Sequence, residues 1–354
     1  METQQGSTNE SKQKHGKMKV LLVSLSCILM AVGQIAGPLL CRMYFLHGGK
    51  RKWLTSWLLT AGFPVMILPI SIFYMSSKAK TDQHLFITRW LFWACAILGI
   101  LLGFNSYLYS FGISYLPVSV SSLLSSTQLA FTAVFAFVVV KHKFTHFSIN
   151  AVILMTFGSI LLGFHMNGDR PKGEPNGEYV LGFFMTIGGA AVHGFLMAAL
   201  EYTQKNSAIS FTFDIFMQFQ LLVSIFATLF CSVAMIINKD FQAIPEEARE
   251  FGLGEIKYYT ILVLAAIANQ FSIIGSIGVI FSSNSLLAGL VTSLLVPVLQ
   301  LFSVVFLREG FSGEKGMALA MSVWAFASYL YGEHQASQNK KLALGGEEVN
   351  NDSV

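Results

Sequence analysis

Charged residues are scarce in this chain of 354 residues. They make up 12% of it, against 54% for hydrophobic residues, and the mean hydropathy is +0.59. A soluble domain carries about 25% charged residues, so this chain cannot cover a folded core with a water-facing surface. The composition excludes an ordinary soluble protein and predicts one that lies in a lipid bilayer.

Clustered cysteines and a basic face are also missing. Cys27, Cys41, Cys95 and Cys231 form no C-x-x-C pair and all lie in apolar runs, so we expect neither disulfides nor a metal site. The lysines and arginines flank apolar runs, as they do at membrane edges. Without a basic face, we expect no nucleic-acid partner.

Motifs of catalysis and of ATP hydrolysis are absent as well. The chain has no G-x-x-x-x-G-K-[ST], no H-E-x-x-H and no G-x-S-x-G. We therefore expect no enzymatic activity and no cofactor. Any transport would draw its energy from a gradient or from the concentration difference of the substrate itself.

Long apolar runs are what the chain does have. A helix crosses the hydrocarbon core with about 20 mostly apolar residues, and ten runs meet this length: 20–45, 53–76, 89–113, 117–140, 147–165, 179–203, 212–237, 257–281, 284–307 and 314–332. The polar tails 1–19 and 333–354 are expected to be disordered. Ten spans put both termini on one side, but Lys and Arg are almost equally shared between the two sides and do not orient the chain.

An internal repeat organises these runs. A shift of 167 residues aligns residues 117–145 with 284–312, and both segments end in a short charged turn that closes on Phe-Thr or Phe-Ser. We infer two five-helix repeats, 20–165 and 179–332, joined by the loop 166–178. Because each repeat has an odd number of spans, the two are inverted relative to each other.

The fourth run, 117–140, carries two polar stripes when plotted as a helix. Ser119, Ser122 and Ser126 fall on one face, and Ser121, Ser125 and Gln128 on nearly the opposite face. The serines are compatible with either helix packing or a polar lumen. Gln128 fits packing less well, because it is neither small nor apolar.

Other polar side chains lie at membrane depth, where they are costly and usually face the bundle interior. Each amide taken singly is explained by an interhelical hydrogen bond, but together they would suit a pocket for a flat, nitrogen-containing solute, with Tyr109 able to stack on a ring face. The candidate substrate-binding residues are Gln34, Asn105, Tyr109, Ser125, Gln128, His193, Gln218, Gln220, Asn269, Gln270 and Gln300.

Glu201 is the one carboxylate well inside a run. It is the candidate for proton coupling, with a structural ion pair or an interface anchor as the alternatives. Small-residue motifs that favour close helix packing occur at Gly33-x-x-x-Gly37, Gly99-x-x-x-Gly103 and Ala190-x-x-x-Gly194.

Several stretches together resemble the plant purine permease family, over residues from about 20 to 333. They are Gly37-Pro38-Leu39-Leu40-x-Arg42-x-Tyr44-Phe45, Gly48-Gly49-Lys50-Arg51, Thr60-Ala61-Gly62-Phe63-Pro64, Tyr107-Leu108-Tyr109, Tyr115-Leu116-Pro117-Val118-Ser119, Gln128-Leu129-Ala130-Phe131, Glu246 to Phe251 and Tyr329-x-Tyr331-Gly332-Glu333.

The resemblance implies a drug/metabolite transporter fold: an all-α polytopic membrane protein with ten transmembrane helices as two inverted five-helix repeats around a central cavity. It also implies a proton-coupled importer of purine bases, cytokinins and related heterocycles, in the plasma membrane, with both termini cytosolic. The implied partners are a small heteroaromatic substrate, protons and the lipid bilayer.

Departures from the family pattern bear on the substrate. The family pattern has an Asp at the position of Asn105, and a Glu at the positions of Gln218 and Gln300. It often has a Trp at the position of Asn269 and a Tyr at the position of His193. Uptake of plant alkaloids such as benzylisoquinolines or nicotine, on the same fold, is therefore the alternative. A membrane receptor without transport is the alternative from another class.

Overall fold

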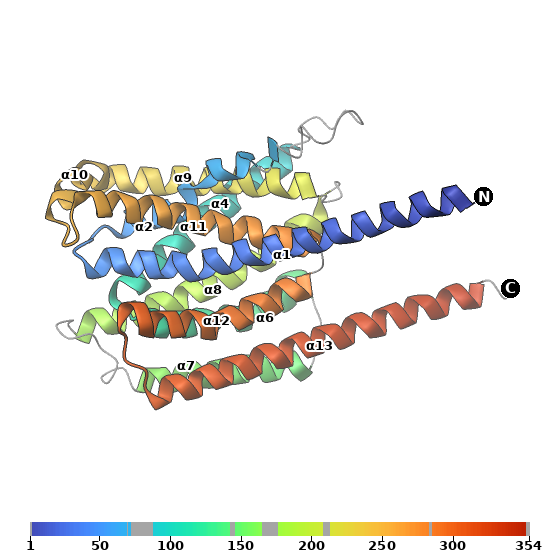
Figure 1. Ribbon diagram of the computed structural model, residues 1–354. Helices are drawn as coiled ribbons and strands as arrows, with labels where there is room; N and C mark the ends of the chain where they lie inside the picture. The colour runs from blue at the N-terminus through green and yellow to red at the C-terminus, as the bar shows by residue number, and fades with distance from the viewer. Residues whose placement is uncertain are drawn as a thin grey trace. The chain divides into compact units, whose positions relative to one another are not determined.

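The computed structural model describes residues 2–68, 70–71, 88–141, 146–164, 176–207, 213–282 and 285–351, and all regular structure in them is helical (Figure 1). Six helices are long and apolar enough to cross a membrane: Val20–Leu46, Arg89–Tyr115, Val118–Val139, Gly177–Asn206, Ile215–Ile237 and Glu255–Ile280. Large apolar side chains such as Ile236, Leu301 and Val305 are exposed, as a bilayer requires and water does not allow. The prediction of a polytopic all-α membrane protein is confirmed.

The chain forms two compact units, and each unit contains helices from both predicted repeats. Unit 1 comprises Met1–Ser110 and Ala208–Leu295. It holds α1 (Glu2–Leu46), α2 (Lys52–Ala61), the short 3₁₀ helix η1 (Phe63–Met66), most of α4 (Arg89–Tyr115), α9 (Phe213–Ile237), α10 (Asp240–Glu250) and α11 (Glu255–Ser282).

Small residues bring the helices of unit 1 together. α1 lies along α11 (Figure 1), and a Cβ on Gly33 would be 2.3 Å from the backbone nitrogen of Ser272. On α4, a Cβ at Gly99 would be 2.4 Å from Cβ of Phe226 on α9. Glycine is needed at these positions because no side chain fits between the backbones. The predicted role in close packing is confirmed for Gly33, Gly99 and Gly103, while a Cβ at Gly37 would make only ordinary contacts, at 3.5 Å.

Unit 2 comprises Phe111–Ser207 and Val296–Val354. It holds α5 (Val118–Ser126), α6 (Gln128–Val140), α7 (His146–Phe164), α8 (Asn176–Asn206), α12 (Ser285–Leu307) from Val296 onward, and α13 (Gly313–Asn351). α7 lies along α13 and α6 along α8. The third predicted motif is also confirmed, since a Cβ on Gly194 of α8 would be 2.6 Å from the backbone nitrogen of Thr132 on α6.

The fourth predicted span is confirmed as a membrane-crossing segment, Val118–Val139, with a local irregularity between α5 and α6 at Thr127, whose backbone stays helical with φ of −62° and ψ of −14°. The Thr127 amide donates to Leu124 O, three residues earlier, at 3.1 Å. The hydroxyls of Ser126 and Thr127 also donate to carbonyls three residues earlier, both at 2.6 Å. Such hydroxyls compete with the backbone amides for helical carbonyls and bend helices. The hydroxyl groups of this serine-rich segment therefore account for the local irregularity at Thr127.

The expected disorder of the polar tails stays a prediction, although α1 begins at Glu2 and α13 ends at Asn351. One further expectation is corrected. The polar stretch after residue 237, expected as a loop, contains α10. Residues 72–76 of the second span, 142–145 of the first charged turn and most of the loop 166–178 lie outside the described residues.

Candidate functional site

The predicted site residues divide between the two units. Unit 1 holds seven of them: Gln34 on α1, Asn105 and Tyr109 on α4, Gln218 and Gln220 on α9, and Asn269 and Gln270 on α11. Unit 2 holds the other five: Ser125 on α5, Gln128 on α6, His193 and Glu201 on α8, and Gln300 on α12. Whether they bind a solute stays a prediction.

The structure brings α1 and α11 together at two of these residues. Asn269 donates from Nδ2 to Ala265 O at 2.8 Å, within its own helix. Its side chain lies over Gly37, where a Cβ would be 3.5 Å from both Nδ2 and Oδ1. Gln34 lies three residues before Gly37 and so shares its helix face. The Asn269 amide therefore packs directly against α1 at Gly37.

Two buried glutamines have amide groups that lack any hydrogen-bond partner among the described residues. Gln270 is 0% exposed and Gln300 is 1% exposed, and neither Oε1 nor Nε2 of either is bonded. Gln270 lies close against the Gly62 backbone, where a Cβ would be 2.5 Å from its Cγ. An unpaired buried polar group costs about 1–3 kcal/mol. Both amides therefore carry a desolvation cost that no described residue offsets.

Glu201 lies near the C-terminal end of α8 and pairs with Lys205 at 3.0 Å. The Glu201 side chain is 37% exposed and that of Lys205 is 53% exposed. A pair of this kind, four residues apart on one helix, contributes little energy. This geometry matches the ion-pair alternative, while the coupling role stays a prediction.

The first serine stripe is used for packing and capping in unit 2. Glu309 accepts hydrogen bonds from the Val118 and Ser119 amides at 2.7 and 3.0 Å, and from Ser119 Oγ at 2.8 Å. A carboxylate at the start of a helix satisfies free amides and the positive end of the helix dipole. Ser126 Oγ lies 3.0 Å from Ser322 Oγ of α13. These serines are structural.

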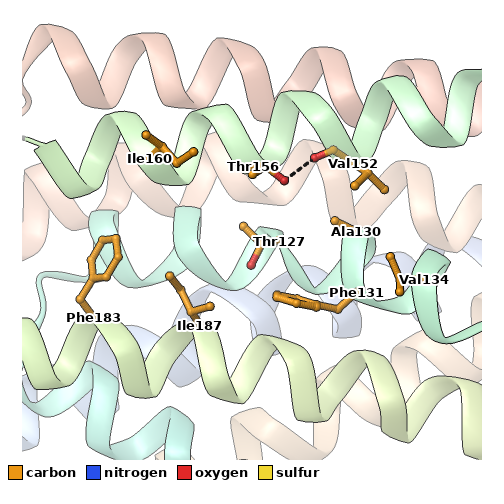
Figure 2. Close-up of a pocket in the computed structure, with 9 residues that line it drawn as sticks. All are labelled: Thr127, Ala130, Phe131, Val134, Val152, Thr156, Ile160, Phe183 and Ile187. Carbon is orange, nitrogen blue, oxygen red and sulfur yellow. Dashed lines mark hydrogen bonds between the residues drawn. The ribbon is translucent and has the colours of Figure 1, made fainter.

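Unit 2 also encloses a cavity of about 290 Å³ between α5–α6, α7 and α8 (Figure 2). Its walls are apolar, with Phe131, Ile160 and Phe183 among them. Its two hydroxyls are already bonded to backbone carbonyls, Thr127 to Leu124 at 2.6 Å and Thr156 to Val152 at 2.7 Å. The cavity can hold a hydrocarbon group, and the described residues that line it offer a purine edge no free hydrogen-bond donor and include no predicted site residue.

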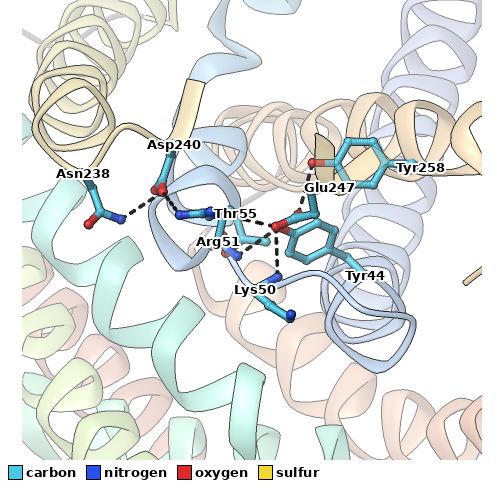
Figure 3. A network of polar contacts seen from close by, with 8 residues as sticks. All are labelled: Tyr44, Lys50, Arg51, Thr55, Asn238, Asp240, Glu247 and Tyr258. Carbon is cyan, nitrogen blue, oxygen red and sulfur yellow. Dashed lines mark hydrogen bonds and ion pairs between the residues drawn. The ribbon is translucent and has the colours of Figure 1, made fainter. Parts of the chain in front are cut away.

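A polar cluster at one end of unit 1 was not predicted (Figure 3). Glu247 of α10 accepts hydrogen bonds from the Tyr44 hydroxyl, from the Tyr258 hydroxyl at 3.1 Å and from the Lys50 amide at 3.3 Å. The cluster joins α1, the α1–α2 connection, α10 and α11. It lies beside the aromatic core formed by Tyr44, Phe251 and Tyr258.

Arg51 and Asp240 complete this cluster. Arg51 pairs with Asp240 at 3.2 Å and with Glu247 at 3.6 Å. Asn238 donates to the same Asp240 oxygen, Oδ1, at 2.9 Å. Burial raises the pKa of the Asp240 carboxyl above its usual range, and the nearby Arg51 charge opposes this only in part. Segments 48–51 and 246–251, which contribute Arg51 and Glu247, both resemble the purine permease family in sequence. The sequence does not show that these two segments meet in the fold.

Comparison with known proteins gives one consistent result. The profile of a family described as purine nucleobase transmembrane transport matches residues 21–340. Purine permease 3 of Arabidopsis thaliana is 41% identical over 325 residues, covering 90% of this chain and 93% of the relative. Purine permease 2 of the same plant is 39% identical, covering 92% and 95%. A solved crystal structure with 17% identity aligns with a TM-score of 0.50, over 86% of this chain and 97% of the other, and bears on the fold alone.

Proposed function

Because the chain belongs to the purine nucleobase transmembrane transport family, we propose that it is a secondary transporter of purine bases and related nitrogen heterocycles. The observation that carries this proposal is the match over nearly the whole chain, from residue 21 to residue 340. The transporter is not an enzyme and needs no cofactor in this proposal.

Gln270 of unit 1 and Gln300 of unit 2 are each a candidate substrate contact in this proposal, and each is argued within its own unit. Each amide presents one donor group and one acceptor, and a purine ring presents the complementary nitrogens and amines on its edge. The other amides, His193, Ser125 and Tyr109 are secondary candidates, each within its own unit. The support is that the two glutamines are buried and unpaired, a cost that a bound heterocycle would remove.

The architecture we propose is ten spans as two inverted repeats around a central cavity. Two observations support it. Lys141 and Arg308, which the 167-residue shift aligns, both adopt left-handed backbone conformations, with φ of 58° and 52°, at the ends of α6 and α12. The pairs α2 with α9 and α7 with α13, which pack together, are counterparts in the two repeats. A two-fold axis brings such counterparts together.

Proton symport, with both termini cytosolic and the protein in the plasma membrane, completes the proposal. Uptake of labelled adenine into yeast lacking its own purine uptake tests it, with empty-vector cells as the control. We expect saturable uptake that rises at acidic external pH and collapses with an uncoupler. Uptake unaffected by either treatment would contradict the coupling. Binding without net uptake in sealed vesicles would contradict transport.

Competition distinguishes the substrates. Unlabelled purines, cytokinins, nicotine and a benzylisoquinoline are added to the adenine uptake assay. Displacement by purines and cytokinins alone fits a purine carrier. The exchange of the family's acids for Gln218 and Gln300 is the observation that favours an alkaloid carrier, and displacement by alkaloids at lower concentration than by purines would support it.

Glu201→Gln tests the predicted coupling residue. Loss of uptake, or loss of its pH dependence, with normal expression would support the role. Lys205→Gln is the matched control, because it breaks the same ion pair while leaving the carboxylate in place. Normal pH-dependent uptake by Glu201→Gln would leave Glu201 as a surface ion pair.

A further inference from the structure

The polar cluster of unit 1 has an excess of negative charge. Two carboxylates, Asp240 and Glu247, lie within 3.6 Å of a single guanidinium, that of Arg51. Lys50 contributes only its backbone amide to the cluster, and its exposed side chain points away in Figure 3. The Asp240 side chain is 0% exposed and that of Glu247 is 9% exposed. A buried charge without a partner is costly, and a carboxylate removes this cost by binding a proton.

The two carboxylates are not equally supported. Glu247 uses both oxygens: Oε1 accepts from Tyr44 and Tyr258, and Oε2 accepts from the Lys50 amide and faces Arg51. Asp240 receives both of its donors, Arg51 and Asn238, on Oδ1. Its Oδ2 is buried and has no partner among the described residues. Hydrogen bonds to an ionised carboxylate favour the charged form. Asp240 Oδ2 accepts no hydrogen bond from the described residues, so this oxygen is the one that takes up a proton most readily.

We propose that Asp240 is a proton-binding site, loaded at Oδ2, through which the position of α10 and the rate of uptake respond to pH. With Asp240 neutral, Arg51 and Glu247 form a balanced pair, and the Arg51–Asp240 pair, one of the two ion pairs that tie α10 to residue 51, is weakened. The raised pKa of the Asp240 carboxyl agrees with this assignment. The dependence of uptake on pH rests on the proposed function; the binding of the proton does not.

The location of the cluster suits this role. α1 runs from the N-terminal tail to Leu46, and the cluster follows its C-terminal end, so the cluster lies on the membrane face opposite residue 20. With cytosolic termini, as proposed above, that face is the outer one. Arg51 is 37% exposed and Asn238 is exposed, which gives protons a route from solvent. The groups facing Asp240 and Glu247 are Tyr44 of α1, Lys50, Arg51, Asn238 and Tyr258 of α11.

Infrared difference spectra of the purified protein test proton binding without any transport. On acidification we expect a carbonyl band of a protonated carboxylic acid that is absent from Asp240→Asn. Glu246→Gln is the matched control, because Glu246 is an exposed carboxylate on the same helix, and it should keep the band. A band that persists unchanged in Asp240→Asn would overturn the proposal.

A second variant keeps the test independent of how well Asp240→Asn folds. Asn238→Ala removes one of the two hydrogen bonds to the charged Asp240 carboxylate, so the midpoint of the band should move to higher pH. An unchanged or lower midpoint would overturn the assignment. In the adenine assay, Asp240→Asn should reduce the dependence of uptake on external pH while uptake still collapses with an uncoupler, and Glu246→Gln should keep the full dependence. If adenine is not transported at all, the proposed function fails while the infrared result still decides the proton site.

Discussion

The amide groups of Gln270 and Gln300 are conspicuous at the scale of single residues, because both are buried and unpaired. The sequence could identify them, since an amide in an apolar run stands out from its neighbours. It could not distinguish them from Asn269, whose amide bonds to its own helix. That distinction depends on side-chain rotamers. The Arg51–Asp240–Glu247 cluster was missed because charges beside span ends are ordinary in sequence, and only folding brings residue 51 to residues 240 and 247.

Gln270→Leu separates a binding role from a structural one. Replacing an unpaired amide with an apolar group of similar size should leave stability unchanged or raise it by about 1–2 kcal/mol. The KM for adenine should rise, because the substrate loses a partner. Thermal melting and uptake kinetics measure the two effects. Gln242→Leu, at an exposed position of α10, is the matched control and should change neither. A less stable Gln270→Leu with normal KM would contradict the binding role.

The stability of the protein should fall as pH rises through the pKa of Asp240. The folded state raises this pKa above its ordinary value of 3.8, so the folded protein binds the proton more tightly than the unfolded chain. The contribution of the protonated Asp240 carboxyl to the free energy of unfolding is therefore present at low pH. It is lost as the pH rises through the pKa of Asp240 in the folded protein. Tm values across a pH series, compared between wild type and Asp240→Asn, check this. The variant should show a flatter profile, and equal slopes would contradict the argument.

At the scale of helices, close backbone contacts decide which pairs form. A Cβ on Gly33 would lie 2.3 Å from Ser272 N and 2.4 Å from Ala268 O, both backbone atoms of α11 that cannot yield. Gly99 likewise lets α4 approach the backbone of α9, and Gly194 lets α8 approach the backbone of α6. The motif spacing predicted that these glycines face a partner helix. It did not name the partner, because pairing is non-local.

Gly33→Ala should separate α1 from α11. We expect a loss of about 1–3 kcal/mol, the usual range for overpacking, seen as a lower Tm and less folded protein in size-exclusion profiles. Gly188→Ala is the matched control, because a Cβ at Gly188 meets nothing within 4 Å. It should be neutral or stabilising by up to about 1 kcal/mol. Equal effects at the two positions would contradict the packing argument.

Hydropathy located the six helices that are long and apolar enough to cross a membrane among the described residues, since the length of an apolar run is fixed by bilayer thickness. It did not locate the irregularity at Thr127 or the helix α10. Both depend on where hydroxyl and carboxylate groups find partners: the Thr127 hydroxyl on Leu124 O, and Glu247 of α10 on Tyr44 and Tyr258. Periodicity reports which face is apolar and carries no information on such bonds.

At the scale of the whole molecule, the two compact units cut across the order of the chain. Unit 1 takes residues 1–110 and 208–295, and unit 2 takes the rest. Neither half of the sequence contains a complete unit. The halves of the chain are therefore thermodynamically dependent on each other, although a repeat is visible in each.

Expressing the chain as two pieces, 1–207 and 208–354, tests this dependence. Each piece alone should be degraded or sensitive to protease, because α1 lacks α11 and α7 lacks α13. Co-expression should restore a protease-resistant pair, with the intact chain as the control. A resistant fragment 1–207 on its own would contradict the dependence.

The pairing of α1 with α11 also means that α1 is synthesised long before its partner helix. Glu255, the first residue of α11, is made about 200 residues after α1 ends at Leu46, or about 10–40 s later at ordinary rates of translation. During that interval the Gly33 face of α1 is in the membrane without its partner, with Gln34 beside it. The insertion machinery or another early helix must shield this face until α11 emerges. Slow codons or helix-destabilising changes in 255–282 should therefore lengthen the exposure of a segment made at the very start of the chain.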